Sequence, residues 1–166
     1  AKKVALVYGK YETMLKANGG VDFDDLLLKT AVLLRDKAEI RAELQEKYQY
    51  ILIDEYQDTN HAQFLIVNML AMNHKNLCAT GDPDQSIYGW RGANLNNILE
   101  FEEFYPNAKV VLLEQNYRST KTILRAASEL IAHNSKRKKK DLWTDNENGA
   151  RIVILENENE HAEAAE

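Results

Sequence analysis

Residues 50–58 read YILIDEYQD, and the character of this stretch changes in its middle. Residues 50–53 are apolar or aromatic and favour a strand, and two acids, Asp54 and Glu55, follow immediately. A short apolar run before a turn predicts a strand that is buried on both faces, as in a parallel sheet. The end of such a strand would bring Asp54 and Glu55 to the carboxyl edge of the sheet, where open α/β folds bind their ligands.

Neighbouring carboxylates at this position have a definite chemical use. A hard cation such as Mg²⁺ takes oxygen ligands, and waters and nucleotide phosphates usually complete its shell. One of the two carboxylates could hold that metal while its neighbour orients or deprotonates an attacking water, as at the Walker B position of a nucleoside triphosphatase. The alternative is a strand that ends in a solvated acidic turn, and the two residues alone do not separate these interpretations.

The composition sets outer limits on the function. A chain of 166 residues suits one domain, or one domain and a piece of another. The net charge of −5 means that nucleic-acid binding would depend on a local basic patch or on stacking aromatics. The single cysteine, Cys78, excludes an intrachain disulfide and a cysteine-based zinc site, and its apolar neighbours predict that it is buried. No apolar run approaches the length of a membrane span, and no signal peptide is evident. Because the chain begins with Ala, we expect a fragment of a larger protein.

Hydrophobic periodicity predicts helices alternating with short strands. That order predicts an α/β fold with a parallel sheet and right-handed crossovers. Asp22 is the expected cap of the second helix, and residues 58–60 supply caps for the fourth. The expected helices are 4–16, 22–35, 38–47, 61–72, 94–104 and 119–133, and the expected strands are 50–53, 77–80, 109–113 and 151–155.

A second segment with candidate functional side chains, GDPDQSIYGWRGA, spans residues 81–93 and follows the strand predicted at 77–80. Gln85 carries a neutral amide that could sense a terminal phosphate or its water through hydrogen bonds. Tyr88 and Trp90 lie two residues apart with Arg91 next, and flat rings beside a cation suit stacking on unpaired bases. The alternative is that Trp90 belongs to the core, but the glycines around it favour an exposed loop.

A third segment, QNYRS at residues 115–119, follows the strand predicted at 109–113. The Tyr117 ring could stack on a purine, and the Arg118 guanidinium could hold phosphate oxygens. The alternative is a core tyrosine beside a surface arginine.

The basic run KRKKK at 136–140 is either a solvated loop or a phosphate contact. In a parallel sheet the segments after all three strands would reach one edge, so we predict that Asp54, Gln85 and Arg118 converge there.

Residues 21–163 resemble the superfamily 1 DNA helicases of the UvrD/PcrA/Rep group. The resemblance is carried by DFDDL at 22–26, by DEYQDTN at 54–60 (motif II), by residues 81–93 (motif III) and by QNYRS at 115–119 (motif IV). It implies a fragment of a RecA-like, P-loop NTPase-type motor with flanking helices. Residues 1–20 would end an accessory subdomain, 21–116 would form the rear of the first motor domain, and 117–166 would begin the second.

The resemblance also implies roles for the site residues, with ATP and Mg²⁺ as cofactors of the intact parent. Asp54 would hold Mg²⁺, Glu55 would act on the attacking water, and Gln85 would link the γ-phosphate to the DNA site. Tyr88, Trp90 and Arg91 would contact single-stranded bases, Tyr117 would stack on adenine, and Arg118 would reach the γ-phosphate. The implied parent moves 3′ to 5′ on single-stranded DNA and 3′-tailed duplexes, with its remaining helicase domains as partners and no membrane, in the bacterial cytoplasm at the nucleoid.

One departure from the helicase pattern concerns the phosphate loop. No Gly-x-x-x-x-Gly-Lys-Ser/Thr segment occurs in the sequence, and motifs I, Ia, V and VI are also absent. We therefore expect the parent, but not residues 1–166 alone, to hydrolyse ATP. The alternatives are a non-catalytic DNA-binding or interaction module derived from the same fold, and a nuclease-fused relative of the motor. Unpaired strand edges would also favour self-association of the fragment.

Overall fold

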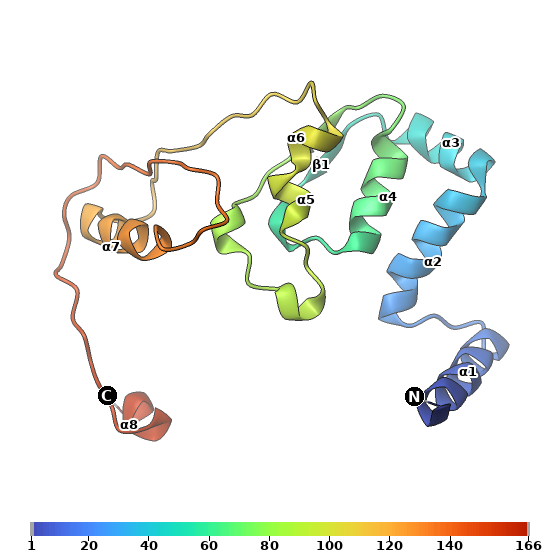
Figure 1. Cartoon of the computed structure of the whole chain (residues 1–166), viewed down its shortest axis with the longest axis horizontal. Helices are drawn as coiled ribbons and strands as arrows, with labels where there is room; N and C mark the ends of the chain where they lie inside the picture. The colour runs from blue at the N-terminus through green and yellow to red at the C-terminus, as the bar shows by residue number, and fades with distance from the viewer. Residues whose placement is uncertain (1, 166) are drawn as a thin grey trace. The chain divides into compact units, whose positions relative to one another are not determined.

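The computed structural model describes residues 2–165 of the chain. The chain divides into two compact units, residues 1–105 and residues 106–166. The first unit holds the sheet and most of the helices (Figure 1). In the described residues no helix is both long enough and apolar enough to cross a membrane.

The sheet of the first unit has two parallel strands, β1 (Ile51–Ile53) and β2 (Leu77–Ala79), joined by the crossover helix α4 (His61–Ala71). Leu52 lies opposite Cys78 in the register. Backbone pairing continues beyond the strands, because Thr80 N donates to Ile53 O at 2.8 Å and Tyr56 N donates to Thr80 O at 2.9 Å. The predicted parallel α/β arrangement is therefore confirmed in this unit.

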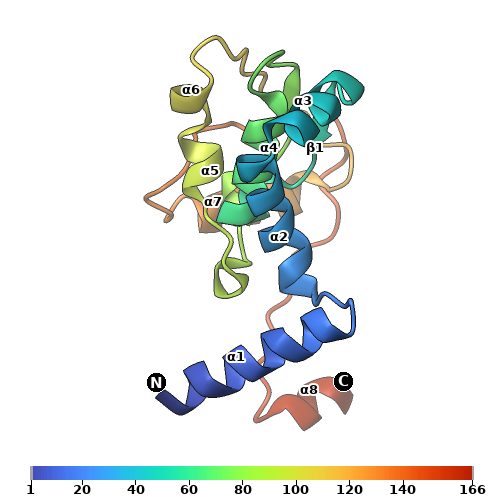
Figure 2. The same ribbon diagram turned by 90° about the vertical axis from the view of Figure 1, so that its right-hand side faces the viewer.

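The helices before the sheet are α1 (Lys2–Ala17), α2 (Phe23–Asp36) and α3 (Ala38–Lys47), in agreement with the sequence pattern. The predicted cap of α2 is confirmed, since Asp22 Oδ1 accepts from Asp25 N at 2.8 Å in a capping box. Helices α2, α3 and α4 pack side by side (Figures 1 and 2). Leu34 (1% exposed) and Phe64 (8% exposed) are among the core side chains of this layer.

The helix predicted at 94–104 is instead two short helices, α5 (Asn96–Leu99) and α6 (Phe101–Phe104), separated at Glu100. Two sets of contacts accompany the break. Asn97 Nδ2 donates to the backbone oxygen and the hydroxyl of Thr59, at 3.1 and 3.0 Å. Phe101 and Phe104 pack edge-on against the rings of Tyr56 and Phe64, at centroid distances of 5.5 and 4.9 Å. These tertiary contacts outweigh the local preference for one continuous helix.

The prediction that the first strand is buried on both faces is wrong for this chain. Leu52 is 78% exposed and Cys78, expected to be buried, is exposed beside it. Ile51 and Ile53 point to the opposite face and are partly buried. Within residues 2–165, one face of the sheet is covered and the face with Leu52 and Cys78 is open to solvent.

The second unit contains α7 (Lys121–Ile131), close to the helix predicted at 119–133, and α8 (Glu160–Ala165). Its loops are held by a parallel bridge between Gln115 and Trp143. The strands predicted at 109–113 and 151–155 are absent from the described residues, and their apolar side chains are exposed. A strand needs a ladder partner for its backbone groups, and neither segment has one here, so the strand prediction is wrong at both places.

Candidate nucleotide and nucleic-acid site

The acidic turn, which we define as residues 54–58, leaves the end of β1 in an unusual conformation. Glu55 has φ 51° and ψ 42°, in the left-handed region that side-chain-bearing residues rarely adopt. The 3₁₀ turn η1 (Tyr56–Asp58) follows directly. Asp54 and Glu55 are exposed, whereas Tyr56 is 0% exposed and Gln57 is 1% exposed. The turn therefore presents two carboxylates to solvent and anchors itself with the next two side chains.

The buried Tyr56 ring lies at the base of the turn. Burial, and after it the neighbouring Tyr105, raises the pKa of the Tyr56 phenol from 10.0 to about 12. Its hydroxyl has no hydrogen-bond partner among the described residues. Tyr56 thus contributes as an apolar ring and stays neutral at physiological pH.

Asp54 is held as an ionised carboxylate. Its Oδ1 accepts from Thr80 Oγ1 at 2.6 Å and from Glu55 N at 3.0 Å. The Thr80 hydrogen bond, and then the Glu55 amide, hold the pKa of Asp54 below its ordinary value of 3.8. An exposed, ionised oxygen ligand of this kind fits Mg²⁺.

Asp54 would need other ligands for such an ion. No group of three or more His, Cys, Asp or Glu residues in the described part of the chain could hold a metal. With Asp54 as a protein ligand, the remaining ligands of such an ion would be phosphates and waters, which is the usual situation for Mg²⁺ at nucleotide sites.

The turn after β2 lies against the acidic turn. Asp82 caps the 3₁₀ turn η2 (Pro83–Gln85), and its backbone N–H donates to Gln57 Oε1 at 3.0 Å. Gln85 is exposed and its Nε2 donates to Asp82 Oδ2 at 2.8 Å. Gln57 also donates to Glu55, so hydrogen bonds of Gln57 and Asp82 connect Glu55 to Gln85. Two of the predicted catalytic residues therefore belong to one network.

The aromatic loop, which we define as residues 87–92, is exposed. Trp90 is 79% exposed and Tyr88 is 41% exposed, with ring centroids 6.4 Å apart and planes at 44°. The Arg91 guanidinium carbon lies 5.2 Å from the Trp90 ring centroid, and Gly92 ends the loop at φ 85°. The alternative that Trp90 is a core residue is therefore wrong. The loop, whose backbone is yellow-green in Figure 1, therefore offers an aromatic pair and a cation to solvent.

The second unit carries the remaining predicted residues. Tyr117 is 78% exposed, and its hydroxyl donates to Gln115 Oε1 at 2.7 Å. Arg118 is exposed as well, and Asn116 Oδ1 orders the backbone there by accepting from Arg118 N and Ser119 N, at 3.0 and 2.8 Å. A core position for Tyr117 is thus wrong. The convergence of Arg118 with Asp54 and Gln85 stays a prediction, because they belong to different units.

Sequence reasoning did not identify Thr80 or Gln57. Thr80 orients Asp54 from the neighbouring strand, and Gln57 binds Glu55 from within the acidic turn. Gln57 lies two residues after Glu55, and this spacing is the only feature of the local sequence that could have indicated the contact. The contact between Thr80 and Asp54 spans 26 residues of sequence, so no local pattern could have indicated it.

Two family models match the chain. The UvrD/REP helicase N-terminal domain matches residues 1–106, and the UvrD-like helicase C-terminal domain matches residues 111–166. The chain therefore belongs to the UvrD/REP family of helicases.

Among individual relatives, the chain is similar to proteins named ATP-dependent DNA helicase PcrA. It is 53% identical to the one from Leuconostoc citreum over 161 residues, covering 97% of this chain and 22% of the relative. It is 54% identical over 164 residues to those from Staphylococcus aureus (strain Mu50) and Staphylococcus epidermidis, covering 99% of this chain and 22% of each relative. The chain thus spans about a fifth of the length of these curated relatives.

Proposed function

We propose that this chain is part of an ATP-dependent DNA helicase that moves along single-stranded DNA. The observation that carries the proposal is the acidic turn, where an exposed Asp54 with a lowered pKa lies next to Glu55. Within a family of helicases, such a pair at the end of a parallel strand suits nucleotide hydrolysis. The name of the similar relatives, ATP-dependent DNA helicase PcrA, agrees with that chemistry.

In this proposal the first unit supplies the groups that act on the terminal phosphate. Asp54 would hold Mg²⁺, which when bound neutralises charge on the phosphate oxygens. Glu55 would orient the attacking water and accept its proton. Gln85 would hydrogen-bond the γ-phosphate, and its bond to Asp82 would connect that contact to the acidic turn. From the second unit, Tyr117 would stack on adenine and Arg118 would reach the γ-phosphate.

The aromatic loop would bind DNA. Tyr88 and Trp90 offer exposed faces on which unpaired bases can stack, with Arg91 beside them. Stacking tolerates every base, which suits a motor that steps along any sequence. The substrates would be single-stranded DNA and 3′-tailed duplexes, with movement 3′ to 5′, in the bacterial cytoplasm at the nucleoid.

The same proposal assigns the parts of the chain. Residues 21–116 would be the rear of a first RecA-like motor domain, preceded by the end of an accessory subdomain at 1–20 and followed by the start of a second motor domain at 117–166. The partners would be the other helicase domains of the full-length protein. The exposed sheet face with Leu52 would favour self-association of residues 1–166 in isolation.

Substitution of Glu55 tests the proposal in the full-length protein. Glu55→Gln should lower DNA-stimulated ATP turnover by about 100-fold or more, because it removes the proton acceptor and keeps the shape. ATP binding and melting temperature should change little. Glu46→Gln, at an exposed position of α3, is the matched control and should keep full turnover. Undiminished turnover in Glu55→Gln would overturn the proposal. Residues 1–166 alone, which contain no phosphate loop, should not turn over ATP, and Glu55-dependent turnover by them would overturn that separate expectation.

A further inference from the structure

Gln57 is among the most completely buried large side chains of the described residues, at 1% exposed. A buried primary amide has two N–H donors and a carbonyl oxygen, and leaving them unpaired is costly. An apolar residue could fill the same space without that requirement. The position of this amide next to two carboxylates therefore calls for an explanation beyond packing.

The Gln57 amide connects two segments of the site. Its Nε2 donates to Glu55 Oε2 at 2.8 Å and to Asp58 Oδ2 at 3.2 Å, while its Oε1 accepts from Asp82 N at 3.0 Å. The Ser86 hydroxyl also lies 3.4 Å from the Gln57 backbone oxygen. Both amide protons and the carbonyl oxygen thus have partners, and the partners lie on both sides of the junction between the acidic turn and η2.

These contacts fix the orientation of the amide. If the amide were flipped, its oxygen would face the carboxylates of Glu55 and Asp58, and its NH₂ would face the Asp82 N–H. Both arrangements would be repulsive. The amide therefore has one favourable orientation, and in that orientation it binds the Glu55 carboxylate.

Gly81 allows this close approach. A Cβ at position 81 would lie 2.5 Å from Gln57 Oε1 and 3.1 Å from Tyr56 N, so the backbone after β2 reaches the amide only because residue 81 has no side chain. Glu55 itself is exposed and has a left-handed backbone. An exposed carboxylate on such a turn would rotate freely without a buried group to hold it.

We infer that Gln57 is a positioning residue that fixes the Glu55 carboxylate relative to the turn that carries Gln85. Gln57 does not touch the nucleotide in this scheme. The inference rests on the proposed function, because it assigns Glu55 a catalytic role.

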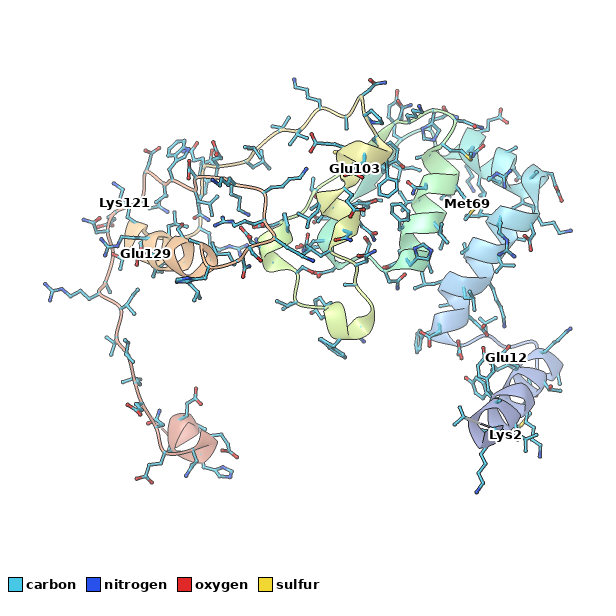
Figure 3. The ribbon with its side chains drawn as sticks, viewed as in Figure 1. Lys2, Glu12, Met69, Glu103, Lys121 and Glu129 are labelled. Carbon is cyan, nitrogen blue, oxygen red and sulfur yellow. The ribbon has the colours of Figure 1, made fainter. Side chains whose placement is uncertain are left out.

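The test compares two buried glutamines in the full-length protein. Gln57→Met keeps the volume and removes the amide. Gln45→Met is the matched control, because Gln45 is 5% exposed and its side chain is hydrogen-bonded to Met69 O, at 2.5 Å, and to Asn73 rather than to the acidic turn. Met69 lies on α4 (Figure 3). Gln57→Met should lower kcat for ATP by about 10- to 100-fold, with KM for ATP within about twofold, because a displaced catalytic group slows chemistry more than binding. Gln45→Met should keep kcat, even if it lowers the melting temperature as much as Gln57→Met does.

A double-substitution cycle separates positioning from packing. If Gln57 acts through Glu55, the variant with both Glu55→Gln and Gln57→Met should turn over no more slowly than Glu55→Gln alone. Independent, multiplicative losses would overturn the inference. Should Gln57→Met fail to fold, Gln57→Asn replaces it, since the shorter amide keeps the donors but withdraws them from Glu55, and the same loss of kcat is expected.

The failures of the two proposals are distinguishable. Normal kcat in the Gln57 variants together with a large loss in Glu55→Gln would overturn the positioning role and leave the proposed function standing. An equal loss of kcat in Gln57→Met and Gln45→Met would also overturn the positioning role. Normal turnover in Glu55→Gln would overturn the proposed function, and the positioning role with it.

Discussion

Tyr56 and Gln57 in the acidic turn are almost completely buried, whereas Trp90 in the aromatic loop is 79% exposed. The acidic turn is held by hydrogen bonds to Thr80 and Asp82 on the neighbouring segment. The aromatic loop is a 3₁₀ turn closed by its own backbone bonds, such as Arg91 N to Tyr88 O at 2.9 Å. Both regions belong to the first unit, so the difference is local.

The contrast follows from what each region would bind. Groups that act on a phosphate need fixed positions, because catalysis depends on preorganised geometry. Groups that stack on bases need accessible faces and tolerate small shifts. Substitutions of the buried side chains of the acidic turn should therefore lower stability, and substitutions in the aromatic loop should lower DNA affinity alone.

The largest expected effect is that of Tyr56→Ala. Removing a fully buried ring that packs against Phe101 should lower the free energy of unfolding by about 3–5 kcal/mol. Urea denaturation followed by far-ultraviolet circular dichroism measures the change. Tyr50→Ala is the control, because Tyr50 is 77% exposed and its loss should change stability by less than about 0.5 kcal/mol. Equal losses in the two variants would contradict the buried anchor.

Trp90→Ala should show the opposite pattern. Loss of one stacking ring should weaken single-stranded DNA binding by about 1–3 kcal/mol, with unchanged stability. Fluorescence anisotropy with a labelled oligonucleotide measures the affinity, and Trp90→Phe should restore most of it. Leu52→Ala, also at a highly exposed position (78%), should leave DNA affinity unchanged. A Trp90→Ala variant that binds DNA normally would remove the loop from the DNA site.

A smaller effect is expected at Asn60, which lies just after the acidic turn and bridges to Ala93, just after the aromatic loop. Its side chain caps α4 by accepting from Gln63 N at 3.0 Å, and its backbone forms a bridge with Ala93. Asn60→Ala should lower the free energy of unfolding by about 1 kcal/mol, and Asn60→Ser should keep most of it, since serine is also a good cap. The same urea titration measures both. An Asn60→Ser variant as unstable as Asn60→Ala would show that the cap is not the cause.

The smallest effect concerns the ionisation of Asp54. Thr80→Val removes the main cause of its lowered pKa, so the pKa should rise toward 3.8, as measured by carboxyl carbon chemical shifts during an acid titration. A folded-state pKa below the unfolded value stabilises the protein above the unfolded pKa, and this contribution is lost as pH falls through the folded pKa. The variant should therefore lose a little stability at neutral pH and depend less on pH in the acid range. Thr13→Val on α1 is the control, and an unshifted Asp54 pKa in Thr80→Val would contradict the assignment.

Much of the helical structure could be predicted from the sequence, because its signals are local. The cap at Asp22 and the end of α1 before Gly19 depend on residues within one or two turns. The strands predicted at 109–113 and 151–155 had suitable residues but lack partners in the described chain. Strand formation depends on a neighbour that the segment itself does not specify.

The site residues, too, could be predicted only where the signal in the sequence is local. Exposure of Trp90 followed from the glycines beside it, and the position of Asp54 and Glu55 followed from the strand before them. The side chains that hold Asp54 and Glu55 in place could not be predicted from the sequence. The role of Thr80 depends on the register of β1 against β2, and that of Gln57 on the close approach of Gly81, and both are tertiary facts.

The left-handed backbone of Glu55 has a consequence for evolution and engineering. This conformation costs a residue with a side chain roughly 1–2 kcal/mol, which glycine would not incur. Screening for heat resistance alone should therefore enrich glycine at position 55 where this gain exceeds the loss of the hydrogen bond from Gln57 to the Glu55 carboxylate. Under the proposed function, thermostability and turnover would then select in opposite directions at this one codon.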